Sequence, residues 1–146
     1  MTQSAQDLAD QNLFEAMREH ARWQSAGECE EDAGLLMVAG ANAFPALFRN
    51  SVVRLDPAVS PRDTLMRARD FFARYKRGYT VMLLERRDGD LDQALRASGL
   101  APSGEAPCML IENPLPEPKV PPDVRVELFR ELRHVTDAVG INAQAY

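Results

Sequence analysis

The feature that most constrains this fold is a run of prolines towards the C-terminal end of the chain. Residues 113–122 read Asn-Pro-Leu-Pro-Glu-Pro-Lys-Val-Pro-Pro, with five prolines in ten positions. Proline has no backbone N–H and a fixed φ, which excludes this run from a helix interior or a central strand. Residues 114–122 are therefore predicted to form a stiff, extended linker between two parts of the chain.

The part before the linker, residues 1–113, is long enough for one domain with a hydrophobic core. Across the chain 45% of residues are hydrophobic and 27% charged, a balance typical of globular proteins. The net charge of −5 disfavours binding to nucleic acid or anionic membranes. No apolar run is long enough to span a bilayer, and the N-terminus lacks a secretory signal. We therefore expect a cytoplasmic protein without nucleic-acid or membrane partners.

Hydrophobic spacing predicts an α/β fold for residues 1–113, and we expect its strands to form a mixed, largely antiparallel sheet. Helices are expected at 5–24, 61–77 and 91–98, and strands at 34–40, 48–55, 79–84 and 106–112. Ser60 is predicted to cap the second helix, with Asp63 as its partner in a capping box. Gly78 is expected to end that helix. The acidic stretch 28–32 is interpreted as a solvated loop.

Residues 123–146, beyond the linker, have the pattern of one strand and one helix. The strand is expected at 124–128, and the helix at 131–145 with Leu132, Val135 and Val139 on one face. Two such elements cannot bury a core, so we expect the chain to stop inside a second domain. An uncovered strand edge with apolar neighbours favours association, and we expect a homodimer formed through this tail.

Three aspartates, Asp88, Asp90 and Asp92, are spaced like calcium ligands. An EF-hand loop would need glycine and glutamate where this sequence has Gln93 and Gly99. The favoured interpretation is a turn at Asp88, followed by a helix that Asp90 caps with Gln93 as its partner.

No residue is predicted to be catalytic, to bind a cofactor or to ligate a metal. The chain has no Gly-x-Ser-x-Gly, P-loop or Gly-x-Gly-x-x-Gly motif. His20 and His134 have no interpretable nucleophile or carboxylate nearby in sequence, and structural roles are expected for both. Cys29 and Cys108 are expected to be free thiols.

The order of the expected elements resembles that of the Gcn5-related N-acetyltransferases, the GNAT family. Residues 52–65 look like the family's strand, proline-containing loop and cofactor-binding helix. Residues 91–100 look like its late helix, and residues 124–145 resemble the opening of another GNAT domain. The chain is thus similar to the N-terminal half of a tandem-GNAT protein. The resemblance implies that strands 52–55 and 80–84 are neighbours that splay apart, with helices 5–24 and 61–77 packed on the sheet.

The sequence departs from the family's pattern at the cofactor-binding loop and at the general acid. The family holds the acetyl-CoA pyrophosphate on a loop whose glycines let backbone N–H groups approach the phosphates. Residues 60–65 contain no glycine, Pro61 has no N–H, and Asp63 adds a negative charge. The tyrosine that serves the family as general acid corresponds to Leu95.

These departures imply a degenerate, non-catalytic domain that binds no cofactor. It would support or regulate a following acetyltransferase domain of the same chain, and acetyl-CoA would be the cofactor of that domain. The intact protein would then be an N-acetyltransferase, with this fragment inactive. One alternative is a divergent GNAT domain that itself binds acetyl-CoA, with Arg62 on the phosphates, and transfers acetyl to an amine. Another is a small interaction domain unrelated to the family.

Overall fold

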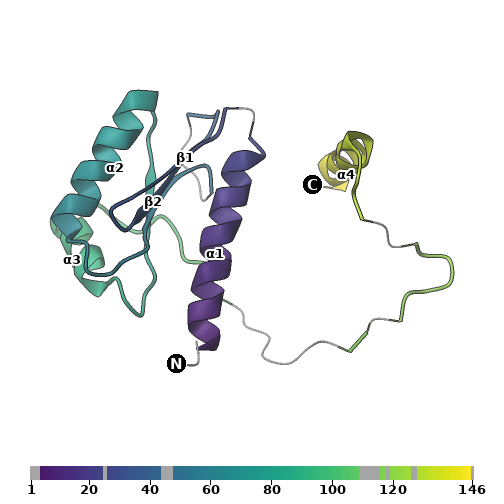
Figure 1. The fold of residues 1–146 in the computed structure, drawn as a ribbon, viewed down its shortest axis with the longest axis horizontal. Coiled ribbons are helices and arrows are strands. Elements are labelled where there is room, and N and C mark those ends of the chain that lie inside the picture. The colour runs from purple at the N-terminus through teal and green to yellow at the C-terminus, as the bar shows by residue number, and fades with distance from the viewer. Residues whose placement is uncertain are drawn as a thin grey trace. The chain divides into compact units, whose positions relative to one another are not determined.

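A computed structural model describes residues 4–24, 26–43, 48–108, 116–117, 119–125 and 128–145. The chain divides into two compact units, Met1–Leu110 and Ile111–Tyr146. The described elements of the first unit are α1 (Ala5–Arg22), β1 (Glu28–Asp32), β2 (Leu35–Ala39), β3 (Asn50–Arg54), α2 (Pro61–Tyr75), β4 (Thr80–Met82) and α3 (Gly89–Ala97) (Figure 1). The second unit contains α4 (Leu132–Ala145).

The four described strands form one mixed sheet in the order β1-β2-β3-β4. β1, β2 and β3 are antiparallel neighbours, and α2 then carries the chain to β4, which pairs parallel with β3. In that parallel pair Val52 lies opposite Val81, and Val53 opposite Met82. The prediction of a mixed, largely antiparallel sheet is confirmed, and the two strands expected to be neighbours are paired.

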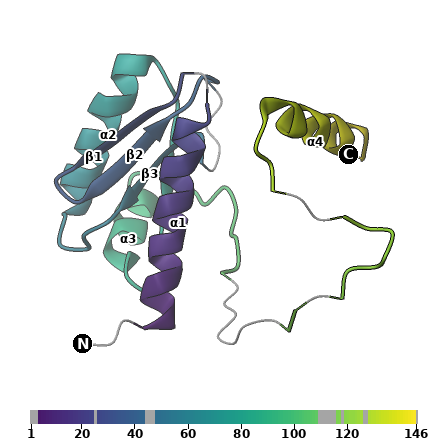
Figure 2. The same cartoon turned by 45° about the vertical axis from the view of Figure 1, so that its right-hand side comes forward.

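The sheet buries both of its faces, because α1 and α2 pack on opposite sides (Figure 2). Alternate residues of each strand point to opposite faces. Thus Leu36 and Val53 join one core cluster with α1, whereas Met37 and Val52 join the other with α2. The two clusters explain why β2 and β3 are buried along their whole length.

Both long helices begin at the residues that the sequence favours. Ser4 caps α1 through a complete capping box with Asp7. Ser60 caps α2 as predicted, because its hydroxyl accepts the backbone N–H of Asp63 at 3.1 Å. The Asp63 carboxylate accepts the Ser60 hydroxyl at 2.8 Å and not the Ser60 backbone N–H, so only the Ser60 half of the predicted capping box is formed.

The acidic stretch and the end of the second helix differ from their predictions. The acidic stretch 28–32 is the strand β1, and its carboxylates are paired with arginines of both helices. The second helix ends at Tyr75, where Lys76 takes the left-handed conformation with φ 54° that was expected of a terminal glycine at 78. The N–H of Arg77 then bonds the Phe72 carbonyl at 3.1 Å, which closes the last turn.

Two predicted strands are not observed among the described residues. Residues 106–108 lie outside any strand, and 109–112 lie outside the described part of the chain. In the second unit, residues 124, 125 and 128 are not in a strand, and 126–127 are not described. The helix expected at 131–145 is confirmed as α4. Within the described ranges, no helix is long and apolar enough to cross a membrane.

Candidate functional site at the carboxyl edge of β3 and β4

The carboxyl ends of the parallel strands β3 and β4 lie at the same edge of the sheet. In open α/β sheets, ligands bind beyond the carboxyl ends of parallel strands, where the following loops diverge. Here β3 leads into the loop 55–60 before α2, and β4 leads into the turn 83–88 before α3. Regular pairing of the two strands stops at Val53 and Met82.

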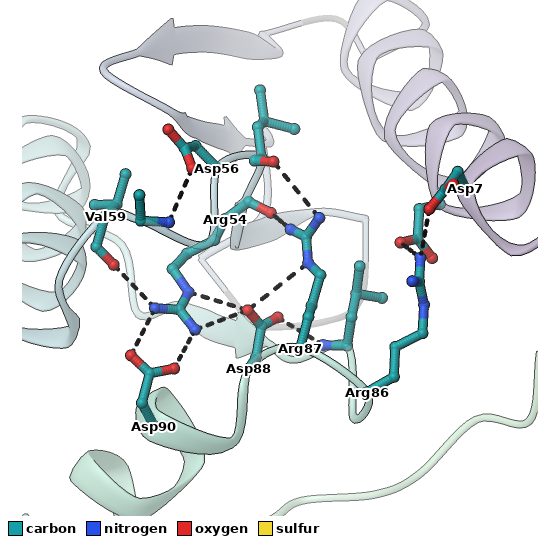
Figure 3. Close-up of polar contacts among 12 residues, drawn as sticks. Asp7, Arg54, Asp56, Val59, Arg86, Arg87, Asp88 and Asp90 are labelled. Carbon is teal, nitrogen blue, oxygen red and sulfur yellow. Dashed lines mark hydrogen bonds and ion pairs between the residues drawn. The ribbon is translucent and has the colours of Figure 1, made fainter. Parts of the chain in front are cut away.

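Arg54, the last residue of β3, lies at this edge with its side chain fully buried. Its Nε and Nη2 donate to Oδ1 of Asp88 at 3.0 and 2.8 Å. Its Nη1 and Nη2 donate to the two carboxylate oxygens of Asp90 at 3.0 and 2.5 Å. Nη1 also donates to the Val59 carbonyl at 2.9 Å (Figure 3). A guanidinium has five N–H donors, and all five are used here.

The two aspartates differ in their surroundings. The Asp88 carboxylate is fully buried, and its second oxygen accepts the backbone N–H of Leu84 at 2.8 Å. The Asp90 side chain remains about half exposed, at 53%. Hydrogen bonds from Arg54 hold the pKa of Asp90 below its ordinary value, and bonds to Asp90 and Asp88 raise the pKa of Arg54. Arg54 and Asp90 are therefore both charged near neutral pH.

Two more arginines connect the turn that precedes α3 to β3 and α1. Arg87 donates to the carbonyl oxygen of Arg54 and lies with its guanidinium 5.5 Å from the centre of the Phe14 ring in α1. Arg86 reaches α1 from the other side of the turn and pairs with Asp10 and Asp7 (Figure 3). We refer to Arg54, Arg87, Asp88 and Asp90 as the strand-end network. It ties β3, α1 and the start of α3 together.

The loop between β3 and α2 is also held in place by hydrogen bonds. The N–H groups of Leu55 and Asp56 both donate to the Gly34 carbonyl, at 2.7 and 3.1 Å. Gly34 has φ +81°, and a Cβ there would lie 2.8 Å from side-chain atoms of Asp56 and Val59. Only glycine fits this position without strain. The loop is therefore fixed by the turn between β1 and β2.

The calcium-like aspartates have other roles in the structure. Asp88 is the residue before α3 but makes no side-chain cap bond, and Asp90 lies within the helix, so the prediction that Asp90 caps it is wrong. Both carboxylates instead form ion pairs with the buried Arg54. Asp92 pairs with Arg96 on the surface of α3. Across the described residues, no group of three or more His, Cys, Asp or Glu side chains could hold a metal ion.

The other residues singled out in the sequence lie away from the strand-end network. Arg62 and Asp63 are exposed in the first turn of α2, and Leu95 is buried in α3. Both cysteines are free, as predicted, and both are exposed. His20 is exposed near the end of α1, with its ring centre 5.7 Å from that of Phe48. In the second unit, the His134 ring lies 6.1 Å from that of Phe129.

Sequence reasoning missed Arg54, although the sequence carries a signal for it. Arg54 follows Val52 and Val53 and precedes Leu55, within a predicted strand whose other residues here are apolar. A buried arginine needs carboxylate partners, because leaving its charge unpaired costs several kcal/mol. The pair Asp88 and Asp90 could have been considered for that role.

The hydrogen bonds of Arg54 determine what this edge of the sheet can bind. The guanidinium that could have bound an anionic ligand is saturated by the protein's own carboxylates. Comparison of the chain with protein-family models, with curated proteins and with solved structures finds no match.

Proposed function

We propose that residues 1–113 form a non-catalytic GNAT-like domain, which supports or regulates an acetyl-CoA-dependent N-acetyltransferase domain following it in the intact protein. The family resemblance rests on the order of elements and on residues 52–65 and 91–100. Its implied fold is supported by the parallel pairing of β3 and β4 and by the helices α1 and α2 on opposite faces. The resemblance implies that these two strands are neighbours and that these two helices pack on the sheet.

The observation that carries the non-catalytic part of the proposal is the strand-end network. Acetyl-CoA presents phosphates, which bind to free backbone N–H groups and unpaired cations. At this edge the one buried cation, Arg54, has all its donors bonded to Asp88, Asp90 and Val59. The carboxylates would repel an incoming phosphate, since like charges at close range are unfavourable.

The start of α2 supports the same conclusion. Pro61 has no N–H, and the N–H of Asp63 is bonded to the Ser60 hydroxyl. The Asp63 carboxylate is held beside that hydroxyl, in the first helical turn, where a phosphate would approach the helix N-terminus. The side chain of Leu95 has no proton to donate to a departing thiolate. The groups that the family uses for phosphate binding and proton transfer are therefore replaced at both of these positions.

The alternative is a divergent domain that binds acetyl-CoA itself. Arg62 favours it, because this residue is exposed in the first turn of α2 and adds a positive charge there. A bond from its guanidinium could replace the backbone contacts of a glycine loop.

Isothermal titration of acetyl-CoA into the full chain distinguishes the two readings. The proposal predicts no binding at micromolar concentrations. Micromolar binding that is lost in Arg62→Ala and kept in Arg69→Ala would establish the alternative. Arg69 is the matched control because it lies on the same helix, is exposed, and pairs with its neighbour Asp70.

A further inference from the structure

The edge strand β1 is unusual because four of its five residues are acidic. Its sequence is Glu-Cys-Glu-Glu-Asp, and none of the five residues is buried. In the described sheet β1 pairs with β2 alone, so its outer edge is open. The neighbouring strand β2 is the opposite in character, with five apolar residues that are all buried. The hydrophobic effect therefore does little to hold β1 in place.

Ion pairs to both helices replace the missing hydrophobic contacts. On one face of the sheet, Glu31 accepts Nη2 and Nε of Arg18 in α1 at 2.7 and 3.2 Å. On the other face, Glu30 accepts Nη2 of Arg74 in α2 at 2.6 Å, and Asp32 pairs with Arg67 of the same helix. The strand's alternating carboxylates thus reach α1 and α2 in turn.

Two of the three arginines also contact residues of their own helices. Arg18 also pairs with Glu15 on its own helix, at 2.7 Å. The Arg74 guanidinium lies 5.0 Å from the centre of the Phe71 ring and 5.7 Å from that of Tyr75. Side chains fixed in this way lose less entropy when they form an ion pair.

We propose that β1 is a charge-latched edge strand. Its three ion pairs with α1 and α2 hold it on β2, and weakening them releases β1 before the rest of the sheet opens. The pairs are at least partly exposed, so dissolved salt screens them. The core clusters on β2 and β3 do not depend on these charges. Ionic strength therefore controls the opening of this edge and exposes β2, an apolar edge of the kind that pairs with other strands.

Hydrogen exchange of the full chain tests this proposal. Amides of β1, compared between about 50 mM and about 1 M NaCl, are expected to exchange roughly three- to tenfold faster at high salt, the range expected for several exposed pairs. Amides of β3 are measured in the same experiment and report global opening. Their exchange is expected to change less than that of β1.

Substitutions of the arginines distinguish the effect of the ion pairs to β1 from general effects of salt on the protein. Arg67→Met with Arg74→Met is expected to show fast β1 exchange already at low salt and a smaller response to added salt. Arg69→Met is the control, since Arg69 lies on α2 and pairs with Asp70 instead of β1. The proposal is wrong if β1 exchange is insensitive to salt, if the control variant has an equal effect, or if β1 and β3 always respond together.

Discussion

The guanidinium of Arg54 and the carboxylate of Asp88 form a fully buried ion pair, with Nε and Nη2 at 3.0 and 2.8 Å from Oδ1. The pair joins the last residue of β3 to the residue before α3, 34 positions later in the chain. Because neither charge is exposed to water, each depends on the other.

Removing one partner of this pair is expected to destabilise the domain strongly. Asp88→Ala leaves the Arg54 charge buried with only Asp90 beside it, and should lower the free energy of unfolding by about 3–5 kcal/mol. Asp92→Ala removes an exposed pair and should cost under about 1 kcal/mol. Urea denaturation of both variants measures the difference. Equal losses would show that the buried pair is no stronger than a surface one.

Asp90 makes the stability of the domain sensitive to acid. Its pKa is lowered in the folded state by the hydrogen bonds from Arg54. A lowered folded-state pKa adds stability above the unfolded pKa of about 3.9, and this is lost as the pH falls through the folded pKa. Asp90→Asn should therefore be less stable than the unsubstituted chain at pH 7, and the gap should narrow below about pH 4. Thermal unfolding at several pH values checks this, and a gap that is constant with pH would contradict it.

The cap of α2 gives a smaller, local prediction. Ser60→Ala removes the acceptor for the Asp63 N–H and should cost about 1 kcal/mol. Ser103→Ala, at an exposed position outside any helix or strand, is the control and should be neutral. If Ser60→Ala leaves thermal stability unchanged but abolishes a measurable ligand affinity, the loop is a binding site.

The elements that the sequence predicts well are those set by local signals. Ser60 and Pro61 mark the start of α2 because capping involves residues only a few positions apart. The strand β2 is also predictable from local sequence, since its apolar composition alone indicates that it is buried. The expected helices at 5–24 and 61–77 accordingly agree closely with α1 and α2.

The elements that the sequence does not predict depend on distant partners. The acidic stretch 28–32 becomes a strand because Arg18, Arg67 and Arg74 neutralise its carboxylates from 13 to 44 residues away. Asp88 and Asp90 look like turn and cap residues until Arg54 is placed beside them. Periodicity within a segment carries no information about such pairings.

The C-terminal tail, residues 117–146, is expected to mediate self-association. Among the described residues of the second unit none is buried, and Val135, Val139 and Ile141 of α4 are exposed apolar side chains. An isolated helix of 14 residues is marginal in water, so burying these side chains against a second copy would stabilise α4. The full chain should therefore be a dimer in light scattering, and a chain lacking residues 117–146 a monomer. A monomeric full chain with a protease-sensitive tail would contradict self-association.

We propose that the strand-end network and the glycine-free loop leave no binding site for acetyl-CoA. The most direct test follows the backbone amides of the full chain by NMR during a titration with acetyl-CoA. Residues 55–64 and 84–90 follow the carboxyl ends of β3 and β4. We expect no shift of their amides at micromolar concentrations of ligand. Saturable shifts concentrated in those two segments would show that this edge binds the cofactor and that the proposal is wrong.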